Sequence, residues 1–302
     1  MKGMMYNMIN EEEILVPKND VIFKRLFGRV KSKEKVKEFL EAILNIRIKD
    51  VILEKETELL PENLDDKVGI LDVRAEFDDG TLIDIEMQNV NQGNIEKRLT
   101  YYLNQLYTSD LQKGKTYNEL NKAIAIGILN FDYFKDIKEH HTIWKMTEQH
   151  NKSKTLEEQE IHFIELPKFL RSEINIDRKL DQWLLFIDYS RKELVKMAEE
   201  KNNLIKEASE EYEYLVGDEA VRRLAFLKRK WELDYNSGIQ YARTEGEKVG
   251  EKRGEKRGEK RGEKRGRKEK QIEIAKKSKD KGIPVETIAE ITGLSVEEIE
   301  KM

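Results

Sequence analysis

The sequence contains no cysteine among its 302 residues. This absence excludes a disulfide framework, a thiolate zinc site, an iron–sulfur cluster and a cysteine nucleophile. No apolar run approaches the roughly 20 residues that a membrane-spanning helix requires. Residues 1–13 also lack the apolar centre of a signal peptide. We therefore expect a cytoplasmic protein that neither spans a membrane nor is secreted by this route.

An excess of one charge is also missing, because 56 Lys and Arg nearly balance 60 Asp and Glu, for a net charge of -4. The balance hides a segregation, since residues 246–270 hold 12 basic and 6 acidic side chains and carry +6, which leaves -10 for the remainder. Four EKRG units repeat over 251–266, and each glycine costs a helix about 1 kcal/mol relative to alanine. We expect a flexible or fraying helical tether there, either a solvated linker or a basic arm that follows nucleic-acid phosphates.

Hydrophobic periodicity predicts the element order α, β, β, β, α, β for the first part of the chain. The expected helices cover 19–28, 32–45 and 95–111, and the expected strands cover 47–59, 69–77, 81–88, 122–131, 141–148 and 160–169. Three helical stretches are expected between 176 and 245. We predict four segments: a core over 1–175, a helical extension over 176–245, a basic tether over 246–270 and a small helical module over 271–302.

The two strands at 69–88 form a hairpin with one apolar and one ionic face. Period-two alternation places Asp72, Arg74 and Glu76 on one face of the first strand and Asp84, Glu86 and Gln88 on the matching face of the second. The apolar faces coincide only if the loop has an odd number of residues, which favours a three-residue loop ending in Gly80. In this register Asp72 lies opposite Glu86, and Arg74 lies opposite Asp84.

Two carboxylates directly opposite one another destabilise a sheet unless a cation stands between them. A hard divalent ion such as Mg²⁺ takes one or two carboxylates together with water and phosphate oxygens. The pair Asp72 and Glu86 therefore indicates a metal site. The alternation is equally compatible with a solvated hairpin face on which Arg74 neutralises the nearby acids.

The ordered segments NDVIFKRLFG, ILDVRAEFDDGTLIDIEMQ, KRLTYYLNQLY and IHFIELPKF resemble the Rpn family of recombination-promoting nucleases, which are PD-(D/E)XK nuclease family transposases. The resemblance runs from about residue 17 to 240. It implies an α/β fold with a PD-(D/E)XK restriction-endonuclease-like core, a mixed sheet flanked by helices. It also implies Mg²⁺-dependent cleavage of DNA, with Asp72 and Glu86 as metal ligands.

Further candidate residues lie around this pair. Gln88 stands where most of the superfamily carries Lys; it cannot act as a base, but its amide can hold the attacking water or a phosphate oxygen. Asp20 matches an acidic position of the family and is a candidate metal contact, or else a helix cap. Four residues of the helix expected over 95–111 share one face: Arg98, Tyr101, Tyr102 and Gln105. This face can contact the phosphates and bases of a nucleic acid, or it is the half-buried side of an amphipathic helix.

Other features carry less chemistry. The histidines have no ligand-like spacing; they are His140, His141, His150 and His162. Residues 281–302 resemble a helix-turn-helix, with Pro284 at a helix start and a capping box from Ser295 to Glu298. Because its second helix is acidic and ends with the chain, partner docking or self-association into a homo-oligomer is favoured over DNA reading.

The leading hypothesis is a Mg²⁺-dependent DNA endonuclease, a hydrolase of phosphodiester bonds that takes part in recombination or transposition. Asp72, Glu86 and Gln88 form its expected catalytic group. The alternative is a catalytically inactive nuclease-fold protein that binds DNA or serves as a scaffold.

Overall fold

The computed structural model describes residues 15–54, 73–109, 111, 116–150, 152 and 154–302. The chain divides into two compact units, Met1–Trp231 and Glu232–Met302. None of the helices in the described ranges is long and apolar enough to cross a membrane. The first unit holds the sheet and the expected site.

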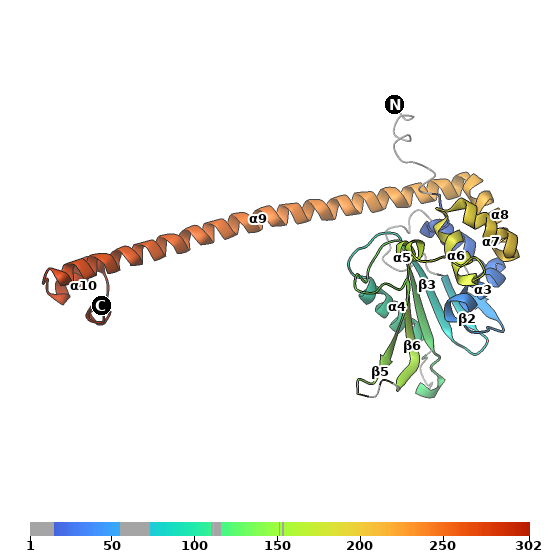
Figure 1. The fold of residues 1–302 in the computed structure, drawn as a ribbon, viewed down its shortest axis with the longest axis horizontal. Helices are drawn as coiled ribbons and strands as arrows, with labels where there is room; N and C mark the ends of the chain where they lie inside the picture. The colour runs from blue at the N-terminus through green and yellow to red at the C-terminus, as the bar shows by residue number, and fades with distance from the viewer. Residues whose placement is uncertain (1–14, 55–72, 110, 112–115, 151, 153) are drawn as a thin grey trace, which may run out of the picture. The chain divides into compact units, whose positions relative to one another are not determined.

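A six-stranded mixed sheet forms the centre of the first unit, with strand order β1-β2-β3-β4-β6-β5 (Figure 1). The strands β3, β4 and β6 are parallel to one another, whereas β1, β2 and β5 pair antiparallel with their neighbours. Their bounds are β1 Val51–Leu53, β2 Val73–Phe77, β3 Leu82–Gln88, β4 Ala123–Leu129, β5 His141–Thr147 and β6 Thr155–Glu165. β6 begins at Thr155, five residues before the expected start at residue 160, because antiparallel pairing with β5 continues to Thr147 and Thr155.

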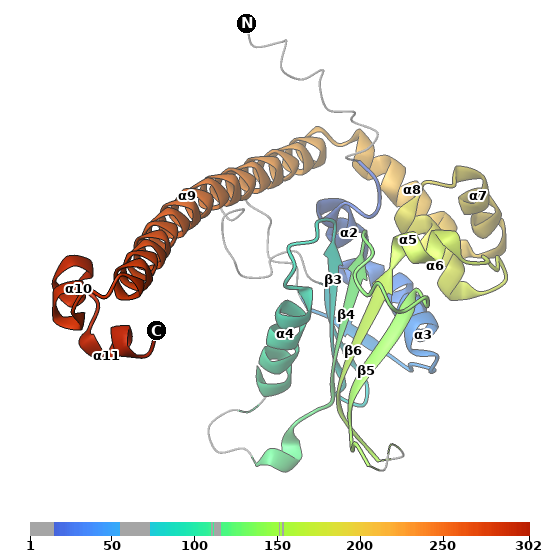
Figure 2. The same ribbon diagram turned by 60° about the vertical axis from the view of Figure 1, so that its left-hand side comes forward.

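The two faces of the sheet pack against different helices (Figure 2). One face carries the larger core and is covered by α2 (Asp20–Phe27), α3 (Lys33–Leu44) and α6 (Lys179–Asp188). The other face is covered by α4 (Ile95–Ser109), whose leucines pack on β4 and β6. The acidic side chains of β3 lie under α4, which sets their environment.

The larger core extends well past residue 175. Trp183 and Phe186 of α6, Val195 of α7 (Lys192–Lys201) and Ile205 of α8 (Asn203–Gly217) belong to the same buried cluster as the sheet. Short α5 (Leu166–Arg171) connects β6 to this group. Four helices, not three, start between 176 and 245, the last being α9 (Glu219–Asp280). The boundary expected at residue 175 therefore lies inside one continuous hydrophobic core.

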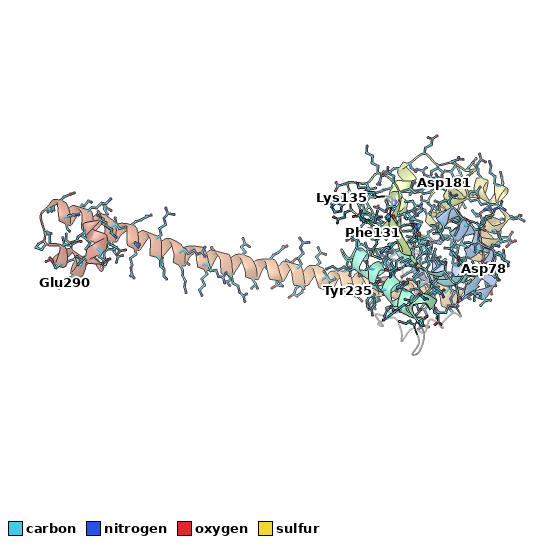
Figure 3. All side chains as sticks on the ribbon, turned by 90° about the horizontal axis from the view of Figure 1, so that it is seen from below. Asp78, Phe131, Lys135, Asp181, Tyr235 and Glu290 are labelled. Atoms are coloured by element: carbon cyan, nitrogen blue, oxygen red, sulfur yellow. The ribbon has the colours of Figure 1, made fainter. Side chains whose placement is uncertain are left out.

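Residues 246–270 are helical throughout, within α9, so the basic tether is one continuous helix rather than a flexible or fraying one. Three of every four residues in the repeat are Glu, Lys or Arg, which are good helix formers. Pairs four residues apart, such as Arg265 with Glu269 at 2.9 Å, add a few tenths of a kcal/mol each. The side chains along this part of α9 project away from the helix (Figure 3).

The C-terminal unit ends in a small helical module with its own apolar cluster. Ala275 of α9 packs with Ile288 of α10 (Val285–Thr292) and with Ile299 of α11 (Val296–Glu300). Leu294, in the loop between these two helices, completes the cluster. The expected capping box is confirmed, since the Ser295 side chain accepts from the Glu298 backbone and Glu298 accepts from the Ser295 backbone. Pro284 precedes α10 as its N-cap residue rather than as its first helical residue.

Candidate metal centre

The hairpin that carries the expected site has the predicted register. Val73 pairs with Ile85 and Arg74 with Asp84, as the three-residue loop requires. Gly80 closes that loop with φ of 86°, a conformation that favours glycine. Asp72, the predicted partner of Glu86, lies outside the described residues, so its role stays a prediction.

The ionic face of this hairpin is buried on β3 rather than solvated. Asp84 is 1% exposed and Glu86 is 2% exposed. Glu86 pairs with Gly127 on β4, where an added Cβ would stand 2.6 Å from a methyl group of Leu99 on α4. The helix therefore rests directly on the strand at this point. The residue before Leu99 in α4 is Arg98, and its side chain reaches Glu86.

The hydrogen-bond donors around these two carboxylates are few and concentrated on one oxygen. Arg98 forms an ion pair with Oε1 of Glu86, and the Gln88 amide donates to the same oxygen at 2.6 Å. Within the described residues, Oε2 of Glu86 and both oxygens of Asp84 accept no hydrogen bond. Nε of Arg74 lies 3.7 Å from Asp84, which is an ion pair but too long for a hydrogen bond.

This environment changes the acidity of both groups. Burial raises the pKa of Glu86 to about 7, although the charge of Arg98 opposes the shift and the charge of Asp84 adds to it. Burial also raises the pKa of Asp84 to about 6, against the charges of Arg74 and Arg98. The cause is a shortage of cations and donors around two acids that have been removed from water.

The start of α2 lies beside the end of β3, because the Asn89 amide donates to the backbone carbonyl of Lys18 at 2.9 Å. Asp20, the acidic candidate on α2, is buried, and its carboxylate lies 3.6 Å from Nζ of Lys228. The alternative role of Asp20 as a helix cap is wrong. The side chain of Asn19 caps α2, accepting from the backbone of Val21 at 3.0 Å.

The four candidate residues on α4 separate into two pairs. The guanidinium of Arg98 lies 5.5 Å from the centre of the Tyr102 ring, and Tyr102 is buried. Tyr101 is 58% exposed and accepts a hydrogen bond from the Gln105 amide at 2.8 Å. Only the first pair faces Glu86, while the second faces solvent.

The residues present fit a hard divalent cation. Asp84 and Glu86 offer three buried carboxylate oxygens without hydrogen bonds, and oxygen ligands are those that Mg²⁺ prefers. Within the described ranges, no group of three or more His, Asp or Glu residues is arranged to hold a metal. Asp72, the predicted partner of Glu86, lies outside these ranges.

Sequence reasoning did not select Asp84 as a site residue, because Arg74 opposite it seemed to neutralise it. It also missed the pairing of Arg98 with Glu86. The spacing that could have revealed both is the alternation Asp84, Glu86, Gln88 on one face, followed by an arginine in the first turn of the helix that covers this face.

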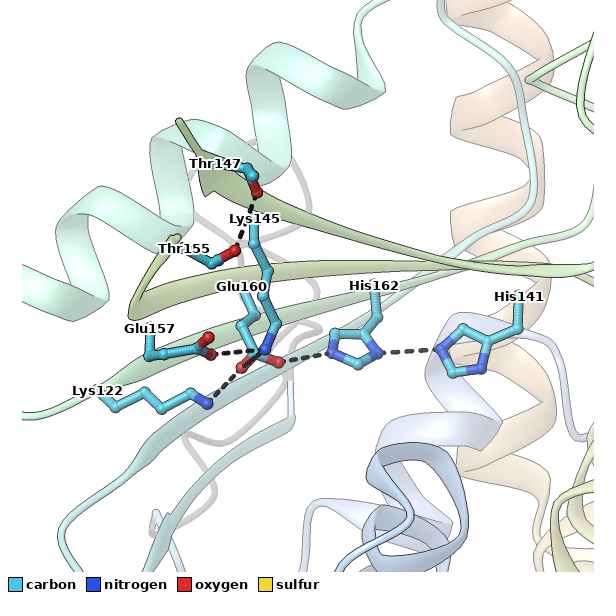
Figure 4. A network of polar contacts seen from close by, with 8 residues as sticks. All are labelled: Lys122, His141, Lys145, Thr147, Thr155, Glu157, Glu160 and His162. Atoms are coloured by element: carbon cyan, nitrogen blue, oxygen red, sulfur yellow. Dashed lines mark hydrogen bonds and ion pairs between the residues drawn. The ribbon is translucent and has the colours of Figure 1, made fainter. Parts of the chain in front are cut away.

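The other face of the sheet carries a second polar network (Figure 4). Nε2 of His141 lies 3.0 Å from Nδ1 of His162, whose Nε2 lies 3.2 Å from Glu160. Glu160 also pairs with Lys122 and, at 2.8 Å, with Lys145. Two of the histidines that sequence spacing left without a role are thus joined to a buried glutamate through hydrogen bonds, without forming a metal site.

The fold and the buried acids define a class: an α/β protein with a mixed sheet, flanking helices and a carboxylate centre on a central hairpin. The chain belongs to the PD-(D/E)XK nuclease family transposases, since residues 17–242 match that family. Membership confirms the resemblance drawn from the sequence and indicates a nuclease-like function, for which DNA is the expected substrate. No curated protein and no solved structure matches the chain.

Proposed function

We propose that this protein is a DNA endonuclease that depends on a divalent metal, Mg²⁺ in the cell, and acts in recombination or transposition. One observation carries the proposal beyond family membership. Glu86, at the position of the family's metal ligand, is 2% exposed and keeps an oxygen that no described residue donates to. Burying a carboxylate oxygen without a hydrogen bond costs free energy unless a ligand such as a metal ion binds it.

Asp72 and Glu86 would hold the metal, and the geometry adds Asp84 as a neighbouring carboxylate on the same strand face. The metal would supply a water of lowered pKa and neutralise charge on the scissile phosphate. Gln88 already donates to Glu86, so its amide fixes the orientation of that carboxylate. Asp20, beside the end of β3, is proposed as an outer contact that acts through water.

Lysine at the position of Gln88 would bring a cation to the site, whereas glutamine brings none. The nearest described cation to Glu86 is instead Arg98 of α4. We therefore assign charge stabilisation to the helix rather than to the strand. Arg98 and Tyr102 are the α4 residues proposed to approach the nucleic acid at the centre, with Tyr101 and Gln105 at its exposed rim.

A metal titration of DNA cleavage tests this function. Nicking of supercoiled plasmid is expected to require Mg²⁺ or Mn²⁺, and Asp72→Ala and Glu86→Ala are each expected to abolish it while circular dichroism stays unchanged. Exposed Lys97→Gln on α4 serves as a matched surface control. Cleavage that survives in both acid variants would disprove the assignment.

The same titration addresses the alternative of an inactive nuclease-fold protein that binds DNA or serves as a scaffold. That protein would bind DNA with an affinity that falls as salt rises, yet would leave plasmid intact in both metals. The self-association expected of the C-terminal module is a separate property. Light scattering before and after deletion of 246–302 measures it, and an unchanged oligomeric state would reject it.

A further inference from the structure

Arg98 pairs with the carboxylate of Glu86, which is also the group that a divalent cation would bind. Its guanidinium contacts Oε1 of Glu86, the oxygen that also accepts from Gln88. A guanidinium and a divalent ion at one carboxylate repel each other strongly in a site with little water. The two cations therefore compete for Glu86.

The two partners of this ion pair differ in their access to solvent. The Arg98 side chain is 31% exposed, whereas that of Glu86 is 2% exposed. Glu86 is held on a central strand under α4, so it cannot follow the arginine outward. The guanidinium can move toward solvent on its flexible side chain, and the Tyr102 ring at 5.5 Å offers it a second contact.

We propose that Arg98 is exchanged between Glu86 and a nucleic-acid phosphate, so that a divalent cation at Glu86 releases the guanidinium to bind the phosphate. The inference rests on the proposed function and deepens it. A planar guanidinium matches phosphate oxygens with two parallel hydrogen bonds. Without the metal, Arg98 is held by Glu86; with the metal, it becomes available to DNA. Metal binding and DNA binding are thereby coupled in both directions.

The first test measures Mn²⁺ affinity by calorimetry in the absence of DNA. Arg98→Gln is expected to bind Mn²⁺ roughly fivefold more tightly than the wild type, a change at the lower end of typical coupling between sites. Arg98→Lys keeps a cation near Glu86 and is expected to stay close to the wild type. Lys97→Gln removes one positive charge from the same helix at an exposed position and is expected to change nothing. Unchanged or weaker binding in Arg98→Gln would overturn the inference.

The second test uses EDTA, so that no metal is present, and a short DNA duplex followed by fluorescence anisotropy. Glu86→Gln is expected to bind the duplex several-fold more tightly than the wild type, because it releases Arg98. Asp84→Asn removes the same charge from the same strand face without touching the ion pair, and is expected to give a smaller gain. The gain of Glu86→Gln should disappear in the double variant with Arg98→Gln. Equal gains in the two single variants would contradict the exchange.

The outcomes separate this inference from the proposed function. If the wild type binds Mn²⁺ and shows the expected variant effects but never cuts DNA, the endonuclease assignment fails and the exchange of Arg98 stands. If plasmid is cut but Arg98→Gln leaves Mn²⁺ affinity unchanged, the endonuclease assignment stands and the exchange fails. Circular dichroism of each variant confirms that the comparison is made between folded proteins.

Discussion

Glu86 and Glu160 are both buried glutamates of the same sheet, yet their surroundings shift their acidity in opposite directions. Burial alone would raise the pKa of Glu160, but hydrogen bonds from His162, Lys122 and Lys145 outweigh it and lower that pKa. Burial raises the pKa of Glu86 to about 7 because the single charge of Arg98 does not compensate for it. The number of hydrogen-bond donors around each carboxylate thus distinguishes Glu160, whose charge is compensated within the fold, from Glu86, whose charge is not.

The lysines around Glu160 explain why burying its charge costs little free energy. Their side chains are 32% and 30% exposed, so each keeps contact with water while its ammonium group reaches the buried carboxylate. Glu86 has no comparable supply of donors under α4. Variants of the two glutamates therefore offer a direct way to challenge the comparison.

The largest expected difference concerns cleavage. Glu86→Gln is expected to lower the rate of plasmid nicking about a hundredfold or more, because even a residue that only supports a metal ligand costs 10- to 100-fold. Glu160→Gln, on the opposite face, is expected to nick at a rate close to that of the wild type. Equal losses in the two variants would show that the contrast between the acids has no functional meaning.

The second difference concerns stability, measured by urea unfolding at pH 7. Glu160→Gln removes the charge that Lys122, Lys145 and His162 share and replaces one acceptor oxygen with an amide donor, so it is expected to lower the free energy of unfolding by about 1–3 kcal/mol. Glu86→Gln gives up the ion pair with Arg98 but also removes a buried carboxylate whose second oxygen has no donor among the described residues, so the free energy of unfolding should fall by less than in Glu160→Gln. A large loss in Glu86→Gln would indicate that this residue serves the fold rather than a ligand.

The third difference is a pH dependence. Between pH 4.5 and about 7 the folded protein holds a proton on Glu86 that the unfolded chain has lost, so stability contributed by this group falls as pH rises through that window. Asp84 acts in the same direction between 3.8 and about 6. Glu160 acts oppositely, losing its contribution as pH falls below 4.5. Because metal binding requires ionised carboxylates, Mg²⁺ should raise the melting temperature more at pH 8 than at pH 5.5.

Calorimetric melting with and without Mg²⁺ at the two pH values measures this effect, and Glu86→Gln provides the control. In that variant the extra stabilisation at pH 8 should largely disappear. If Mg²⁺ stabilised wild type and variant equally at both pH values, the ion would be binding elsewhere.

The smallest expected effect comes from the histidine pair. His162→Gln breaks the contact with His141 but leaves an amide that can still donate to Glu160, so it should cost about 1 kcal/mol, the usual contribution of one hydrogen bond. Plasmid nicking should not change. A loss of nicking with normal stability would transfer functional importance to the face that we consider structural.

Much of this centre could be predicted from the sequence, because local rules dictate it. The length of the loop at Asp78–Gly80 fixes the hairpin register through the parity of the strands. The parity does not say what covers the ionic face, since a solvated face and a face buried under a helix share the same alternation. The alternation therefore leaves open whether Asp84 lies on a solvated face beside Arg74, whereas the structure buries it beneath α4 with Arg74 at 3.7 Å.

Contacts between distant residues could not be predicted for a different reason. Glu86 and Arg98 meet because α4 crosses the sheet at one particular height, and Lys122 meets Glu160 because β4 and β6 pair in parallel. Hydrophobic periodicity predicts neither the height at which a helix crosses the sheet nor the order in which the strands pair. The continuity of the helix over 246–270 could not be predicted either, because the cost of each glycine favours fraying while the propensity of the three residues beside it favours a helix.

Gly127 has no chemistry of its own, yet it leaves room for the side chain that packs α4 onto the sheet beside the acidic centre. A Cβ there would stand 2.6 Å from a terminal methyl group of Leu99, which would have to shift. Leu99 follows Arg98 in α4, and Arg98 pairs with Glu86 on the strand next to Gly127. The packing of a residue without a side chain thus borders directly on the electrostatics of a candidate catalytic centre.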